Sequence, residues 1–135
     1  GPTEGYQEQV YFSEGRTNDD GWSKAVLESA GRGLAFCVQY KTDTLPYFSQ
    51  WKNTVAEADG YVTGLEPGTG FPNPRSFEEE KGRLVELGAS ESREFNVNLR
   101  VLSQSEEVQR LVGELGRDGR GIPAAEFDAQ WCVAE

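Results

Sequence analysis

Apolar and polar residues alternate along much of the chain, which is the pattern of β-strands with one buried face. The clearest case is segment 34–42, LAFCVQYKT, where large apolar side chains recur at every second position. Segment 22–30, WSKAVLESA, precedes it across the short connection Gly31-Arg32-Gly33, so we expect an antiparallel hairpin. Further strands are expected at 6–13, 45–53 and 61–66.

A second hairpin is expected near the end of the alternating region. Its arms would be 83–87 and 92–102, joined by a turn at Gly88-Ala89-Ser90. One face of the second arm is expected to be buried and the other to face solvent. The apolar face carries Phe95, Val97, Leu99 and Val101.

The period then changes from two to that of a helix. Ser103 and Glu106 match a capping box, and apolar residues follow at helical spacing, so a helix is predicted over 104–116. An acidic stretch at 77–81 is expected to form a helical turn. Seven or eight strands and one short helix near the C-terminus predict an all-β fold, a β-sandwich, as a single domain over 1–135. A barrel or a sandwich of the immunoglobulin type would give much the same pattern.

The net charge and the number of cysteines and histidines limit the classes of partner and cofactor that we expect. A net charge of −10 opposes nucleic acid and anionic membranes as partners, since both attract basic surfaces. Cys37 and Cys132 are too far apart in sequence for a zinc pattern, and the chain has no histidine, so we expect no metal and no cofactor. Cys37 is expected to be a buried apolar residue; a Cys37–Cys132 disulfide is the alternative. Residues 17–21, TNDDG, are read as a turn rather than a calcium loop.

The segment 61–75, YVTGLEPGTGFPNPR, is the most distinctive part of the chain. Glu66 ends an apolar strand and opens a loop rich in glycine and proline, where neighbours would partly desolvate its carboxylate and make it a better base. The alternative is a structural role for Glu66, in which it caps loop amides or pairs with Arg75.

Arg75 is also a candidate contact to a sugar, and two other groups are further candidates. Gln50, Trp51 and Lys52 combine an aromatic face with an amide and a cation, which together suit a ring and its hydroxyls. Glu8 lies in a strand where one side chain of each adjacent pair points inward. The alternatives are a core position for Trp51 and solvated positions for Lys52 and Glu8.

Four segments together resemble the aldose 1-epimerase (galactose mutarotase-like) superfamily. They are GPTEGYQEQVYF, LPYFSQWKN, YVTGLEPGTGFPNPR and the closing GRLVELGASESREFNVNLRVL, and the resemblance covers most of residues 1–103. It implies a β-supersandwich with a sugar cleft, to which this chain would contribute the C-terminal half. In that family a late glutamate acts as general base on the anomeric hydroxyl and a histidine acts as general acid on the ring oxygen. Glu66 matches that glutamate.

The chain departs from the family because it has no histidine. The resemblance therefore implies a larger protein whose missing N-terminal half supplies the acid. The expected function is carbohydrate binding, with interconversion of sugar anomers in the intact protein. The alternative is a non-catalytic sugar-binding or structural β-sandwich module. Expected partners are a sugar or sugar phosphate, and either the missing half or a second copy of the chain. The expected location is the cytoplasm.

Overall fold

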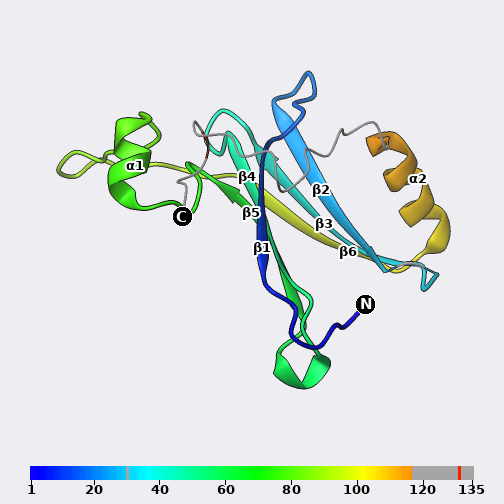
Figure 1. Ribbon diagram of the computed structural model, residues 1–135. Coiled ribbons are helices and arrows are strands. Elements are labelled where there is room, and N and C mark those ends of the chain that lie inside the picture. Colours follow the sequence, from blue (N-terminus) through cyan, green and yellow to red (C-terminus); the bar gives the residue numbers. More distant parts are fainter. Residues whose placement is uncertain (30, 117–130, 132–135) are drawn as a thin grey trace.

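The computed structural model describes residues 1–29, 31–116 and 131. Their strands form two three-stranded antiparallel sheets, with the orders β1-β4-β5 and β2-β3-β6 (Figure 1). The strands are β1 (Gln9–Glu14), β2 (Trp22–Ser29), β3 (Leu34–Lys41), β4 (Tyr47–Asn53), β5 (Val62–Gly68) and β6 (Val97–Leu102). The helices are α1 (Arg75–Glu80), α2 (Ser105–Leu115) and a 3₁₀ turn η1 (Glu57–Asp59).

The two sheets pack against each other through alternate side chains of β3, β4 and β5. Tyr40 of β3 and Phe48 of β4 stack with their ring centroids 5.8 Å apart, and Leu65 of β5 packs on the same cluster. This contact makes the molecule a sandwich, so the predicted fold class is confirmed.

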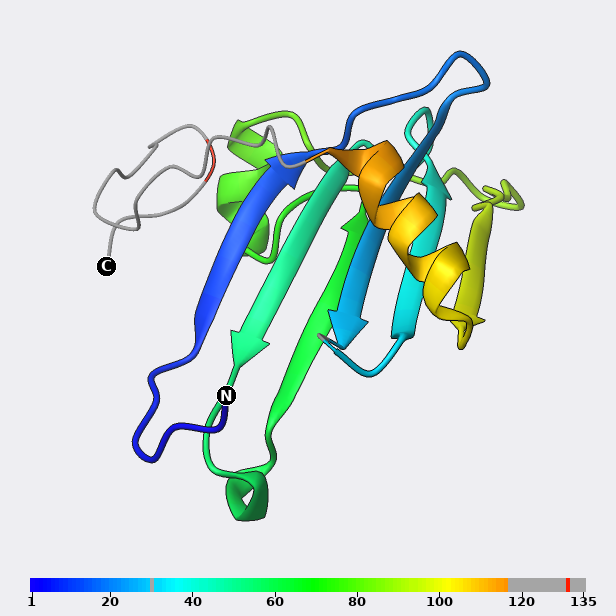
Figure 2. The same cartoon turned by 90° about the vertical axis from the view of Figure 1, so that its right-hand side faces the viewer.

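The opposite face of the β2-β3-β6 sheet is covered by α2 (Figures 1 and 2). Val108 and Leu111 of α2 are buried against Cys37 and Leu102. Cys37 is fully buried and free, as expected of an apolar residue, and burial raises the pKa of its thiol. Cys132, the alternative disulfide partner, lies outside the described residues.

The first hairpin and the turn that precedes it are confirmed. Strands β2 and β3 pair from Trp22↔Lys41 to Ser29↔Leu34. Before them, the Trp22 amide donates to Asn18 Oδ1 at 2.8 Å, and Gly21 adopts a positive φ of 77°. The local sequence therefore forms the plain turn that was predicted.

The second predicted hairpin is wrong in its first arm, because residues 83–87 form no strand. Arg83 is bound to Glu78 beside the other sheet, which holds this segment away from β6. The described residues accordingly contain six strands rather than seven or eight.

The prediction that the apolar face of β6 is buried is also wrong. Val97, Leu99 and Val101 are 42%, 65% and 78% exposed, and Phe95 just before the strand is 46% exposed. The reason is that β6 is an edge strand, and the opposing sheet does not extend beneath it.

The helix over 104–116 is confirmed as α2, but its predicted capping box does not form. The N-cap is Gln104, one residue later than Ser103, and no side chain caps the helix. Glu107, which then lies three residues after the cap, binds Arg100 of β6 instead, at 2.6 Å. A second helix, α1, occupies the predicted acidic turn. None of the described helices combines the length and apolar character needed to cross a membrane.

Candidate functional site

Glu66 lies on the face of the β1-β4-β5 sheet that points away from the sandwich core. In the strand register, Phe12, Ser49 and Glu66 lie directly opposite one another, so their side chains share one face. Phe12 stacks on Phe71 of the following loop with centroids 4.5 Å apart. The loop after β5 therefore folds back over the sheet face that carries Glu66.

This fold-back creates an open cleft of about 490 Å³. Its walls are the end of β5, the loop that follows it and the start of the segment after α1. Buried Ser49 forms part of the floor, and the exposed residues Glu66 and Arg75 lie on the lining. The lining also contains Thr69, Gly70, Asn73, Glu78, Arg83 and Val85.

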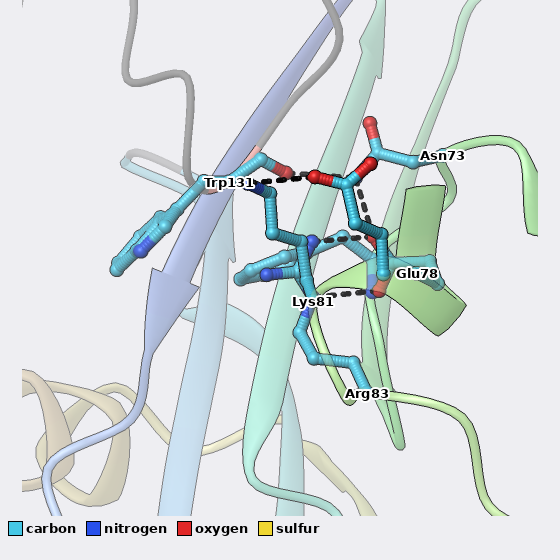
Figure 3. A network of polar contacts seen from close by, with 7 residues as sticks. Asn73, Glu78, Lys81, Arg83 and Trp131 are labelled. Carbon is cyan, nitrogen blue, oxygen red and sulfur yellow. Dashed lines mark hydrogen bonds and ion pairs between the residues drawn. The ribbon is translucent and has the colours of Figure 1, made fainter. Parts of the chain in front are cut away.

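The cleft loop is held by Glu78, a residue that the sequence analysis did not single out. Its carboxylate is 4% exposed and accepts hydrogen bonds from the Phe71 amide at 3.0 Å and from Asn73 Nδ2 at 2.8 Å. Arg83 donates to both of its oxygens, from Nε at 2.7 Å and from Nη2 at 2.6 Å (Figure 3). These four donors satisfy the buried charge, which would otherwise be costly.

Arg83 is itself enclosed by aromatic rings. Its guanidinium lies 5.3 Å from the ring centroid of Phe71, 5.6 Å from that of Phe77 and 5.9 Å from that of Tyr47. The Arg83 hydrogen bonds are the main cause that lowers the pKa of Glu78 to about 2. The carboxylate of Glu78 is therefore ionised at any physiological pH, and it is committed to structure rather than to proton transfer.

Trp131 closes the same corner. Its carbonyl oxygen accepts a hydrogen bond from Asn73 Nδ2 at 2.7 Å, and its ring lies 5.3 Å from Phe71 (Figure 3). This network could not be predicted from the sequence, because Glu78, Glu79 and Glu80 are identical neighbours. Only the folded geometry distinguishes the inward-facing one.

The carboxylate of Glu66 has a different environment from that of Glu78. It lies over Gly64, where an added β-carbon would overlap Glu66 Oε1. Gly64 pairs with Trp51 across the sheet, so the carboxylate lies beside the strand position of Trp51. No ion pair joins Glu66 to Arg75, the structural alternative that the sequence left open.

The other candidate residues divide between the two faces of this sheet. Trp51 shares the Glu66 face, is half-buried, and donates its indole N–H to Glu8 Oε2 at 2.8 Å. Gln50 and Lys52 alternate with Trp51 along β4 and therefore point to the opposite face. There they line a separate cleft between the two sheets, together with Leu34, Phe36, Tyr61 and Val62.

The structure thus brings Glu66 and Arg75 together on the lining of one cleft. Trp51, joined to Glu8, lies on the same sheet face outside that lining, and Gln50 and Lys52 lie on the other face. Ser49, which lies directly opposite Glu66, is a further polar group that the sequence analysis did not select. Among residues 1–29, 31–116 and 131, no cluster of three or more acidic or cysteine side chains could hold a metal ion.

The two-sheet sandwich matches the fold of an aldose 1-epimerase-like protein of known structure. The crystal structure of a "putative aldose 1-epimerase" from Klebsiella pneumoniae subsp. pneumoniae MGH 78578 superposes with a TM-score of 0.79 at 26% sequence identity. The similarity covers 94% of this chain and 35% of that chain, so the chain spans about a third of its relative's length.

The chain belongs to a family described as a domain of unknown function, DUF4432, whose model matches residues 1–101. The match contains every strand from β1 to β5, the cleft loop and α1. No protein with a curated description matches the chain significantly.

Proposed function

We propose that the chain binds an aldose sugar in the Glu66 cleft, and that the Glu66 carboxylate is the general base of anomer interconversion. The observation that carries the proposal is the position of Glu66 on the lining of this cleft, within a fold shared with the Klebsiella protein. Within the described part of the chain, no ion pair engages the exposed carboxylate of Glu66, whereas the nearby Glu78 is paired with Arg83. Glu66 is therefore the acidic group of the cleft that can accept a proton.

The chemistry requires two groups. Glu66 takes the proton of the anomeric hydroxyl while the bond between the anomeric carbon and the ring oxygen breaks, and an acid delivers a proton to that ring oxygen. The open-chain aldehyde rotates, and the reverse steps close the other anomer. The chain has no histidine, and in this proposal the acid is supplied by another polypeptide segment or from solution.

The test is mutarotation followed by polarimetry on D-glucose and D-galactose, with imidazole added as the missing acid. The unaltered chain is expected to accelerate the reaction beyond imidazole alone, and Glu66→Gln is expected to remove that acceleration while leaving the circular dichroism spectrum unchanged. Glu57→Gln, at the far end of the sheet in η1, is the matched control and should keep full activity. A Glu66→Gln variant as fast as the unaltered chain would disprove the base assignment.

A second candidate function is sugar binding without catalysis. The observation that favours it is the absence of histidine, together with a Trp51 ring anchored to Glu8 on the Glu66 face. It predicts a saturable change in tryptophan fluorescence on adding sugar, with no acceleration of mutarotation. The binding signal should be weakened by Trp51→Ala.

A further inference from the structure

Ser49 is a buried polar residue on the floor of the Glu66 cleft, where it is 4% exposed. Ser23 and Glu78 are also buried in the described part of the chain, and both have side-chain partners. Ser23 bonds the hydroxyl of Tyr40, and Glu78 accepts hydrogen bonds from Arg83. Burying a hydroxyl without a partner costs free energy, so the environment of Ser49 requires an explanation.

The Ser49 hydroxyl has no hydrogen-bond partner within residues 1–29, 31–116 and 131. Over the same ranges, no side-chain oxygen or nitrogen is both fully enclosed and unpartnered. The hydroxyl is therefore not sealed inside the protein, and it reaches the cleft whose floor it helps to form. A hydroxyl held in this way can donate a hydrogen bond to a ligand in the cleft and accept one from it.

The strand register places Ser49 beside the proposed base. Ser49 lies directly opposite Glu66 on the β4–β5 ladder, so their β-carbons are about 5 Å apart on one face of the sheet. The carboxylate of Glu66 extends from this row toward Gly64, and no hydrogen bond joins it to Ser49 in the described structure. Two neighbouring groups that do not bond each other can each bond one of two adjacent hydroxyls on a sugar ring.

We propose that Ser49 determines specificity in this cleft by bonding the C2 hydroxyl of an aldose, an assignment that rests on the proposed role of Glu66. With Glu66 on the anomeric hydroxyl at C1, the ring neighbours of C1 are C2 and the ring oxygen. In the proposed reaction the ring oxygen meets an acid from outside the chain, so the C2 hydroxyl is the neighbour that turns toward the cleft floor. The substrate class is then an aldose with a free hydroxyl at C2.

The burial of Ser49 makes this contact selective. A site that bonds a substrate hydroxyl discriminates against an analogue that lacks it, because the protein group is left unpaired in the complex. A 2-deoxy sugar would cover the Ser49 hydroxyl without bonding it. A 2-acetamido sugar also lacks the C2 hydroxyl, and it adds bulk against the closed floor, so it should bind still more weakly.

Titration of the ¹⁵N-labelled 135-residue chain with D-glucose and 2-deoxy-D-glucose tests the assignment. The unaltered chain is expected to bind D-glucose about three- to tenfold more tightly, the effect of one neutral hydrogen bond. Ser49→Ala should remove this preference. Ser13→Ala is the matched control, because it removes a hydroxyl from the opposite face of the same sheet, and it should keep the preference. The ratio of D-glucose to 6-deoxy-D-glucose should be the same in all three proteins.

Urea unfolding gives a readout that separates this role from a structural one. A hydroxyl without a protein partner contributes no hydrogen bond to the fold, so Ser49→Ala should be at least as stable as the unaltered chain. Lower stability of Ser49→Ala, together with equally weakened binding of both sugars, would assign Ser49 to structure and overturn the proposal.

The two assignments in the cleft fail separately. If the preference for D-glucose survives Ser49→Ala while Glu66→Gln weakens binding of both sugars, the role of Ser49 is overturned and the proposed function stands. Equal binding of both sugars by the unaltered chain would also overturn the role of Ser49. Binding of neither sugar would overturn the proposed function, and the assignment of Ser49 with it.

Discussion

Gly64 has no side chain, and the space that its β-carbon would fill is occupied by the carboxylate of Glu66. The carboxylate of Glu66 is the far end of a flexible side chain. A β-carbon at position 64 would therefore displace this carboxylate rather than the strand. No positive φ is required at Gly64, so alanine fits the backbone. The glycine two residues before Glu66 therefore determines where the proposed base lies.

Gly64→Ala is expected to weaken sugar binding and any mutarotase activity about tenfold or more, because the carboxylate moves by roughly an ångström. The melting temperature should stay the same or rise slightly, since alanine restricts the unfolded chain. Gly113→Ala in α2 is the matched control, because its added β-carbon meets nothing within 4 Å. Equal activity of the two variants would contradict the positioning role of Gly64.

The lowered pKa of Glu78 makes the stability of the fold depend on pH in acid. Its pKa falls from an ordinary value near 4.5 to about 2 in the folded protein, mainly through its hydrogen bonds with Arg83. A lowered folded-state pKa stabilises the fold above the unfolded pKa, and this stabilisation is lost as the pH falls from about 4.5 toward 2. The loss amounts to at most about 3 kcal/mol.

Urea unfolding at pH 7, 4 and 3 measures this loss. Glu78→Gln should be less stable than the unaltered chain at pH 7 and should show a flatter dependence on pH over this range. Glu79→Gln, on the exposed neighbour, should reproduce the unaltered pH dependence. If Glu78→Gln kept the full acid sensitivity, the ionised Glu78–Arg83 pair would not be its source.

Among the secondary-structure elements, α2 and β6 both carry an apolar face in sequence, but only the apolar face of α2 is buried. Leu111 of α2 is 7% exposed and packs on the outer face of the β2-β3-β6 sheet, whereas Leu99 of β6 is 65% exposed. Removing buried methyl groups leaves a cavity, and removing exposed ones does not. The two leucines therefore differ in what they contribute to the fold.

Leu111→Ala is expected to lower the free energy of unfolding by about 2–4 kcal/mol, and Leu99→Ala by less than about 0.5 kcal/mol. Chemical denaturation with urea measures both. A loss at Leu99 as large as that at Leu111 would show that the β6 face is buried in solution.

The sequence predicted most strands because alternation is a local property. Strands β1 to β5 and helix α2 all fall within or next to their predicted ranges. The errors came from non-local choices. Residues 83–87 form no strand because Arg83 is bound to Glu78. The exposure of the β6 face depends on which strands lie opposite it. Neither of these contacts can be read from the periodicity of the sequence.

In the molecule as a whole, the candidate residues line two separate clefts. Glu66 and Arg75 line the outer cleft, and Gln50 and Lys52 line the cleft between the sheets. Sequence proximity suggested that Gln50, Trp51 and Lys52 act together, but strand alternation sends Trp51 to one face and its two neighbours to the other. Glu66 could be proposed from its loop and the family resemblance, whereas Ser49 and the Glu78 network required the tertiary structure.

Amide chemical shifts show directly whether a sugar binds in the Glu66 cleft. The ¹⁵N-labelled chain is titrated with D-galactose and D-glucose, with mannitol as an acyclic control. If the sugar binds there, saturable shifts are expected at Thr69, Gly70 and the Trp51 indole, and Glu66→Gln should weaken them. Shifts confined to the inter-sheet cleft at Leu34 and Val62, or no saturable shifts with either sugar, would contradict it.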